Sequence, residues 1–244
     1  MRVAAGTDQG RVRASNEDSI LADASVGVLI VADGMGGHRG GEVASDLAAA
    51  TIHSILREAL SSPEAPGVDP VSLLSRAIEE ANQAVWARAS SDQELHGMGT
   101  TVVVAHSRGD RLWIAHAGDS RAYLLGPGGM TLLTNDHSLV AQMVRSGEIT
   151  ADDARRHPLR NVISRCLGTG KTVQPEIRDF TWTAGETLLL CSDGLTGMLE
   201  DAEIEATVRS AGEDLETACR SLIRLANEKG GKDNVSVILA RNTG

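Results

Sequence analysis

The sequence predicts a layered α+β sandwich, and three observations support this fold class. Strand-like runs are grouped along the chain and helical patterns are grouped too, whereas a parallel α/β sheet would alternate them. Residues 101–133 carry short runs of strand-like composition separated by glycine-containing turns, which predicts an antiparallel meander. Aromatic residues make up only 2% of the chain, so we expect an aliphatic core.

The first half of the chain predicts a buried strand followed by two long helices. Residues 26–32 form a continuous apolar run closed by the Asp-Gly pair 33–34, which predicts a strand buried on both faces and ended by a turn. Apolar residues then recur every three or four positions over 43–60, as in an amphipathic helix. A second helix is expected over 69–85, because an aspartate and a proline begin it and an apolar stripe from Val71 follows.

The second half of the chain predicts an insertion and a closing set of elements. Residues 135–176 are polar, contain a helix-capping pattern at 150–153 and interrupt the strands, so we expect an inserted flap there. The closing elements are strands at 187–191 and 235–240 and helices at 202–208 and 215–226. We therefore expect one domain over residues 1–244, with the flap over 135–176.

The composition excludes several classes of protein. The 33 acidic residues outnumber the 23 basic ones and give a net charge of −10, which disfavours nucleic acid as a partner. No apolar run approaches the roughly 20 residues that a membrane span needs. The three cysteines form no Cys-x-x-Cys pair and indicate neither a disulfide framework nor a zinc site. We expect a monomeric cytoplasmic protein that binds no membrane.

Aspartates recur at the ends of the predicted strands, beside residues that permit sharp turns. These aspartates are Asp18, Asp33, Asp119, Asp193 and Asp233. Each one alone is explained as part of a turn, but together they can place five carboxylates at one end of a sandwich. Such close negative charges stay ionised only if something positive lies among them. Oxygen ligands without a neighbouring histidine pair predict hard cations, Mg²⁺ or Mn²⁺, rather than zinc or copper.

A carboxylate site of this kind suits hydrolysis at phosphorus. Two ions about 3.5–4 Å apart can deprotonate a bridging water and direct it in line at a phosphoryl group. Arg13 precedes Asp18 by five residues and can grip that phosphoryl group with a bidentate guanidinium. The alternative interpretation of Arg13 is a solvated surface arginine.

Six segments, taken in chain order, carry a family resemblance. They are Thr7-Asp8-x-Gly10-x-x-Arg13-x-x-Asn16-Glu17-Asp18, Asp33-Gly34-Met35-Gly36-Gly37-His38, Gly99-Thr100-Thr101, Gly118-Asp119-Ser120-Arg121, Ser192-Asp193-Gly194-Leu195 and Asp233-Asn234-Val235. They resemble the signature motifs of the PP2C-type (PPM) metal-dependent serine/threonine phosphatases, most closely those of the compact bacterial members, over nearly the whole chain. The resemblance implies a four-layer αββα sandwich of two antiparallel sheets flanked by helices.

The resemblance also implies which residues hold Mn²⁺ or Mg²⁺. The implied ligands are Asp18, Asp33, the carbonyl of Gly34, Asp119, Asp193 and Asp233. Asp33 bridges two ions, and Asp119 matches a position that holds an additional, weaker ion together with Asp193 in bacterial relatives. Glu17 is the alternative to Asp18 as the residue that serves the second ion.

One position departs from the pattern of many eukaryotic relatives. Those relatives have a histidine directly after the first Asp-Gly, where it protonates the leaving alkoxide, and this chain has Met35 there. The proton donor is then a metal-bound water or His38, the nearest histidine in the sequence. Arg13, which matches the phosphate-binding arginine, and Asp33 are the implied catalytic residues.

The sequence therefore predicts a phosphatase that hydrolyses phosphoserine and phosphothreonine by direct attack of a metal-bridged water. The resemblance implies phosphorylated proteins as partners, made by bacterial serine/threonine kinases. Two alternatives stay open, a phosphoprotein-binding pseudophosphatase with the same fold and a metal-dependent nuclease, although the acidic composition argues against the nuclease. Basic side chains of the flap are expected to select the phosphopeptide, namely Arg155, Arg156, His157, Arg160 and Arg165.

Overall fold

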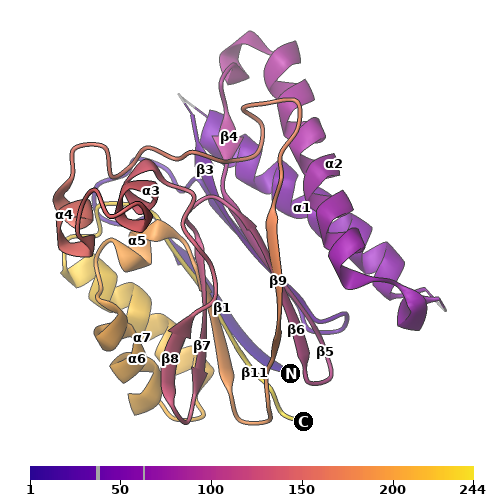
Figure 1. Cartoon of the computed structure of the whole chain (residues 1–244), viewed down its shortest axis with the longest axis vertical. Helices are drawn as coiled ribbons and strands as arrows, with labels where there is room; N and C mark the ends of the chain where they lie inside the picture. The colour runs from indigo at the N-terminus through magenta and orange to yellow at the C-terminus, as the bar shows by residue number, and fades with distance from the viewer. Residues whose placement is uncertain (37–38, 63) are drawn as a thin grey trace.

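The computed structural model describes residues 1–36, 39–62 and 64–244, and it contains two antiparallel sheets packed face to face (Figure 1). The first sheet is formed by β1 (Arg2–Asp8), β11 (Val235–Arg241), β10 (Thr187–Cys191), β7 (Arg121–Gly126) and β8 (Gly129–Leu132), in that order. The second sheet has the order β2 (Asp18–Asp23), β3 (Val28–Met35), β5 (Val102–Arg108), β6 (Arg111–Ala117) and β9 (Glu176–Thr181). A short strand, β4 (Gly99–Thr100), pairs with the end of β3.

Helices cover the outer face of each sheet and complete the predicted αββα sandwich (Figure 1). The second sheet is covered by α1 (Gly40–Leu60) and α2 (Pro70–Ser91), and the first by α5 (Asp193–Thr196), α6 (Asp201–Ser210) and α7 (Leu215–Glu228). Short 3₁₀ helices lie at Ala65–Gly67 and Gln93–Leu95. In the part of the chain that the structure describes, no helix combines the length and hydropathy that crossing a bilayer requires.

Burial on both faces explains why the central strands have uninterrupted apolar sequences. Successive side chains of a strand point to opposite faces of its sheet. In β3, Val28 and Ile30 therefore pack against α1 and α2, whereas Leu29 and Val31 pack against the first sheet. All four are at most 1% exposed, so each face of the strand belongs to a different core layer.

The helix α2 begins as the sequence predicts. The carboxylate of Asp69 accepts a hydrogen bond from the backbone N–H of Ser72 at 3.0 Å, and Pro70 occupies the first turn. The buried stripe runs through Leu74, Ile78 and neighbouring positions. Val71 was expected on this stripe but is 44% exposed, because the buried face passes through Pro70, Leu73 and Leu74 and leaves Val71 toward solvent.

Two expectations about the strands are wrong. The runs over 101–133 do not form one meander, because β5 and β6 pair in the second sheet whereas β7 and β8 pair in the first. The short loop 118–120 therefore crosses between the sheets, although its length would also suit a hairpin. The Asp-Gly pair 33–34 is no turn either, because β3 continues through Met35. A Cβ atom on Gly34 would lie 2.0 Å from the carbonyl oxygen of Gly41, so close backbone packing requires glycine there.

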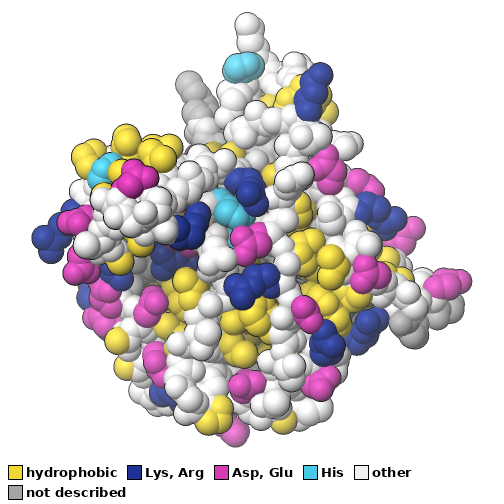
Figure 2. Space-filling model, in the orientation of Figure 1, with side chains coloured by type: hydrophobic (Ala, Val, Ile, Leu, Met, Phe, Trp, Pro, Cys, Tyr) yellow, Lys and Arg dark blue, Asp and Glu magenta, His cyan; other side chains and the backbone are white. Residues whose placement is uncertain are grey.

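The chain between β8 and β9, residues 133–175, carries α3 (Leu139–Arg145) and α4 (Ala151–Arg156), and we call residues 135–175 the inserted segment. The expected capping pattern is present. Thr150 Oγ1 accepts from the N–H of Asp153 at 3.1 Å, and the carboxylate of Asp153 accepts from the N–H of Thr150. The segment forms a lobe beside the sandwich, and hydrophobic side chains gather on its outer side (Figures 1 and 2).

Truncation of Leu74 tests the packing of α2 against the second sheet. Leu74 is fully buried, so Leu74→Ala is expected to lower the free energy of unfolding by about 2–5 kcal/mol. Val71→Ala on the same helix is the matched control and is expected to change that free energy by no more than about 0.5 kcal/mol. Urea denaturation followed by circular dichroism measures both values, and equal losses would contradict the observed packing.

Candidate metal centre

Five aspartates from five different segments lie at one end of the two sheets, the end away from the chain termini (Figure 1). Asp18 and Asp33 are direct partners in the register of β2 and β3. Asp119 follows β6, Asp193 begins α5 directly after β10, and Asp233 precedes β11. Because adjacent antiparallel strands begin and end at the same edge, these positions are neighbours in space although they are far apart in the chain.

The carboxylates lie close enough for their charges to affect one another's pKa values. Burial raises the pKa of Asp33 well above its usual range, and the charges of Asp18, Asp193, Asp119 and Asp233 raise it further, in that order of size. Burial and the charge of Asp233 likewise raise the pKa of Asp193. All five predicted aspartates therefore belong to one cluster, in which the charges of the other four oppose the ionisation of Asp33.

Asp18 is the most deeply placed carboxylate of the cluster and is 9% exposed. The hydroxyl of Ser192 donates to its Oδ2 at 2.8 Å, whereas its Oδ1 is buried with no hydrogen-bond partner among the residues that the structure describes. Burial raises the pKa of Asp18 to about 7 and that of Asp119 to about 8. A buried carboxylate oxygen without a donor, surrounded by further carboxylates, fits a site for a hard divalent cation.

Glu17 lies beside the cluster, where the charges of Arg13 and Asp233 act on its carboxylate. A Cβ atom on Gly41, at the start of α1, would lie 2.5 Å from Oε2 of Glu17, so this carboxylate packs against the first turn of α1. Burial is the main cause that raises the pKa of Glu17, and Asp233 and Glu42 add to it. Its charge is not among the main causes that act on Asp33, whereas that of Asp18 is the largest neighbouring charge there.

Arg13 lies at the edge of the cluster, where its Nη2 contacts Oδ2 of Asp233 at 2.7 Å. Its side chain is 51% exposed, so the guanidinium has donors free for another anion. The hydrogen bond that Arg13 donates to Asp233 raises the pKa of Arg13, so the group is always charged. The structure thus brings Arg13 and the five predicted aspartates together.

Asn234 holds the segment that carries Arg13, a role that the sequence alone did not predict. Its Nδ2 donates to the carbonyl oxygens of Gln9 and Ser15 at 2.9 Å each, and its Oδ1 accepts from the N–H of Glu17 at 2.8 Å. The only signal in the sequence was its place directly after Asp233. Ser192, which donates to Asp18, likewise stands directly before Asp193 and was not assigned a role.

The structure describes Gly34, a predicted metal ligand, but not His38, a predicted proton donor. Gly34 lies at the cluster, where its N–H donates to the carbonyl oxygen of Glu17 at 3.1 Å. His38, one of the two expected proton donors, lies outside the described residues. Met35 is the last residue of β3.

A second group of side chains with metal-ligating atoms is formed by His116, His137 and Glu176, whose atoms lie within 4.8 Å of one another. The two imidazole rings stack at 4.6 Å with an interplanar angle of 10°. Imidazole ligates a metal in the plane of its ring, and two nearly parallel rings do not direct their lone pairs at one point. Burial, with nearby His116 and Arg165, also lowers the pKa of His137 to about 4. We therefore interpret this group as a stack within the fold.

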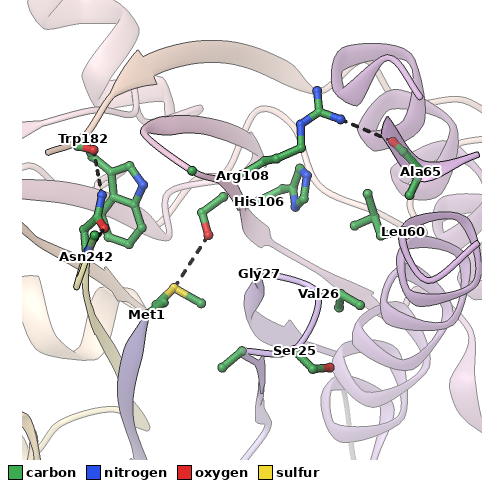
Figure 3. A pocket seen from close by; sticks show the side chains of 14 residues that line it. Met1, Ser25, Val26, Gly27, Leu60, Ala65, His106, Arg108, Trp182 and Asn242 are labelled. Carbon is green, nitrogen blue, oxygen red and sulfur yellow. Dashed lines mark hydrogen bonds between the residues drawn. The ribbon is translucent and has the colours of Figure 1, made fainter. Parts of the chain in front are cut away.

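A pocket of about 440 Å³ lies at the opposite end of the sheets, between the β2–β3 and β5–β6 turns (Figure 3). His106 and Trp182 line it, and their ring nitrogens are buried without hydrogen-bond partners. None of the predicted site residues lines this pocket. The chemistry predicted from the sequence therefore belongs to the aspartate end and not to this pocket.

Comparisons with known proteins agree with this arrangement. The family model described as Protein phosphatase 2C matches residues 5–239. The serine/threonine phosphatase stp of Listeria innocua is 40% identical over 236 residues, which cover 96% of this chain and 92% of that protein. The crystal structure of the Mycobacterium tuberculosis serine/threonine phosphatase PstP/Ppp has a TM-score of 0.90 at 39% identity, covering 100% of this chain and 99% of the other.

A further solved structure, the catalytic domain of the serine/threonine phosphatase PstP in complex with 2 manganese ions, has a TM-score of 0.89 at 37% identity. It covers 100% of this chain and 98% of that one. An αββα sandwich with a carboxylate cluster for hard cations defines a class of metal-dependent phosphohydrolases. The match over residues 5–239 and the 40% identity show that the chain belongs to the protein phosphatase 2C family.

The stability of the metal-free protein is expected to fall as the pH rises from about 6.5 to 8. Asp18 and Asp119 have pKa values of about 7 and about 8 in the folded state, above the unfolded value of about 3.9, so the folded state binds more protons in this window. Buried histidines with lowered pKa values oppose this trend only below about pH 6.5.

Thermal unfolding in EDTA at several pH values measures this slope. Asp18→Asn removes one of the titrating groups and is expected to flatten it, whereas Asp110→Asn in the distant β5–β6 turn is expected to leave it unchanged. Stability that rises through this window in the unmodified protein would contradict the raised pKa values.

Proposed function

We propose that this protein is a metal-dependent serine/threonine phosphatase that hydrolyses phosphoserine and phosphothreonine in proteins. The observation that carries the proposal is the convergence of five carboxylates beside Arg13 in a chain of the protein phosphatase 2C family. Its relatives are named serine/threonine phosphatases at about this length. A pseudophosphatase would be expected to have lost part of the cluster, and every matching aspartate is present here.

The proposed ligands of Mn²⁺ or Mg²⁺ are Asp18, Asp33, the carbonyl of Gly34, Asp119, Asp193 and Asp233. Asp33 is the proposed bridge between two ions, because the other four aspartates all act on its carboxylate. Asp18 is preferred to Glu17, because its Oδ1 is buried with no hydrogen-bond partner among the described residues and its charge is the largest neighbouring one that acts on Asp33. Asp119 and Asp193 are proposed to hold a third ion. Bound Mn²⁺ or Mg²⁺ supplies the Lewis acidity that makes a water molecule a nucleophile near neutral pH.

Arg13 is proposed to bind the phosphoryl group of the substrate. Its half-exposed guanidinium is held at the edge of the cluster by Asp233, and a planar guanidinium can donate two parallel hydrogen bonds to a phosphate. The permanent positive charge at this position also offsets the repulsion between the dianionic phosphate and the aspartates. Arg13 therefore orients the phosphorus toward the carboxylate cluster.

We further propose that residues 1–244 form one phosphatase domain with residues 135–176 as its flap. The proposed partners are proteins phosphorylated by bacterial serine/threonine kinases, met by a monomer in the cytoplasm. Free thiols at Cys166, Cys191 and Cys219 are consistent with a reducing compartment.

Removal of the central carboxylate tests the proposed reaction. With Mn²⁺ present, the purified protein is expected to hydrolyse p-nitrophenyl phosphate and a phosphothreonine peptide, and EDTA is expected to abolish both activities. Asp33→Asn is expected to lower kcat/KM at least about 100-fold. Asp110→Asn makes the same chemical change at the far end of the sheets and is expected to retain activity. Phosphopeptide binding without metal-dependent turnover in the unmodified protein would favour the pseudophosphatase.

Charge reversal in the inserted segment tests whether it selects the substrate. Arg155 pairs with Glu200, and Arg165 contacts the carbonyl oxygen of Gln174, so these two serve the fold. Arg156 and Arg160 are exposed and are available to a peptide. The double variant Arg156→Glu, Arg160→Glu is expected to lower kcat/KM for an acidic phosphopeptide at least about threefold.

The control substrate is p-nitrophenyl phosphate, for which kcat/KM of the double variant is expected to be unchanged because this compound is too small to reach the segment. The control variant is Arg220→Glu on α7. Equal losses on both substrates would contradict a role in peptide selection.

A further inference from the structure

His137 connects the start of the inserted segment to the loop that carries Asp119. Its side chain is 7% exposed, and two of its groups bind the same residue. Nδ1 of the ring accepts from the N–H of Gly118 at 3.2 Å, and the N–H of His137 donates to the carbonyl oxygen of Gly118 at 3.0 Å. Side chain and backbone of His137 therefore hold both peptide groups of Gly118, the residue directly before Asp119.

The imidazole of His137 is fixed from its other sides as well. It stacks on His116, whose own Nε2 contacts the carbonyl oxygen of Asn135 at 2.9 Å. Because Nδ1 of His137 accepts, the proton of the neutral ring lies on Nε2, which faces Oε2 of Glu176 at 3.5 Å. Nε2 also lies 3.3 Å from Nη1 of Arg165, which is itself a donor, so this tautomer suits the contact with Glu176 and not the one with Arg165.

The loop has little freedom on the side away from His137. Gly118 has a φ of +122°, and a Cβ atom there would lie 2.4 Å from the Cβ of Thr101. The hydroxyl groups of Thr101 and Ser120 are hydrogen-bonded at 2.8 Å. The loop is therefore packed against Thr101 on one side and bound by His137 on the other, which determines where the carboxylate of Asp119 points.

The backbone of His137 continues this connection into the inserted segment. Its carbonyl oxygen accepts from the N–H of Ser164 at 2.7 Å, and the next residue, Ser138, pairs with Ile163 in an isolated bridge. His137, near the start of the segment, is thus bonded both to Ser164 further along the segment and to the loop of the aspartate cluster.

We propose that His137 is a positioning residue, which orients Asp119 for cation binding by holding the Gly118 peptide groups through Nδ1 and its backbone. This inference rests on the proposed function, in that Asp119 is taken as a ligand of the weakest ion. His137 touches neither substrate nor ion, and it acts through Asp119. The stacked rings of His116 and His137 thereby have a use other than metal ligation.

Two substitutions of His137, by asparagine and by glutamine, place a side-chain amide at different distances from the backbone and test this role. The oxygen of an asparagine side chain lies at the position of Nδ1, so His137→Asn can still accept from Gly118, whereas the amide of His137→Gln extends one bond further and cannot. Calorimetric titration with Mn²⁺ measures the affinity of each site, and p-nitrophenyl phosphate hydrolysis against Mn²⁺ concentration provides a second readout. His137→Gln is expected to weaken the weakest Mn²⁺ site about 10-fold or more. His137→Asn is expected to stay within about twofold of the unmodified protein.

A double-mutant cycle with Asp119→Asn separates positioning from a general effect on the fold. If His137 acts through Asp119, His137→Gln causes no further loss of Mn²⁺ affinity in the Asp119→Asn background. The same additional loss in both backgrounds, or unchanged Mn²⁺ binding by a folded His137→Gln, would overturn the proposal. If His137→Gln does not fold, His137→Asn decides alone: folded with normal Mn²⁺ affinity supports the proposal, and folded with weak affinity overturns it.

The unmodified protein separates this inference from the proposed function. If it binds no Mn²⁺ and hydrolyses no phosphate ester, the proposed function fails. If it does both while His137→Gln behaves like the unmodified protein, only the role of His137 fails.

Discussion

Repulsion between carboxylates is the constraint around which this end of the molecule is built. The charges of the other four aspartates raise the pKa of Asp33, and that of Asp233 raises the pKa of Asp193, so without cations the cluster opposes folding near neutral pH. Three aliphatic core layers, one between the sheets and one under each helical layer, provide the opposing free energy. The fold therefore holds the negative charges together in a geometry that a hard cation can use.

Neutral donors, and not basic side chains, hold the carboxylate of Asp18 and the backbone of Asp33 in place. The hydroxyl of Ser192 donates to Asp18. The carbonyl oxygen of Asp33 accepts from the hydroxyl of Thr100 and from the N–H of Thr101, each at 2.9 Å. A lysine or arginine at these positions would neutralise the carboxylates and compete with a cation. Arg13 is paired with the cluster, and it lies at the solvent-exposed edge where a substrate phosphate arrives.

The helices and strands whose apolar pattern follows their buried face could be predicted from the sequence. Strands that are held only by hydrogen bonding to a neighbouring strand could not. The strand β3 and the helices α1, α2, α6 and α7 were predicted because their apolar residues follow the buried faces. The strands β1 and β9 were not, since edge strands with mixed polar sequences, such as Glu176–Thr181, are held by pairing with β11 and β6. The five aspartates were predictable because each adjoins a strand end. Contacts such as Asn234 with Gln9, or His137 with Gly118, join distant segments and leave no periodicity to detect.

The attachment of the inserted segment explains why one histidine can matter at a distance from the substrate. The helix α3 buries only Val140 and α4 buries no residue, so these two helices are held mainly by polar contacts, whereas Leu167 and Val173 later in the segment are buried in the core. Two of the polar contacts are ion pairs, the bidentate pair of Arg121 with Asp136 and the pair of Arg155 with Glu200. The bonds from His137 to Gly118 are the ones that reach the loop of Asp119. If His137 positions Asp119, a peptide that shifts the segment and a cation that binds Asp119 both affect the hydrogen bonds between His137 and Gly118. Thermodynamic linkage then requires each of them to change the affinity for the other by the same factor.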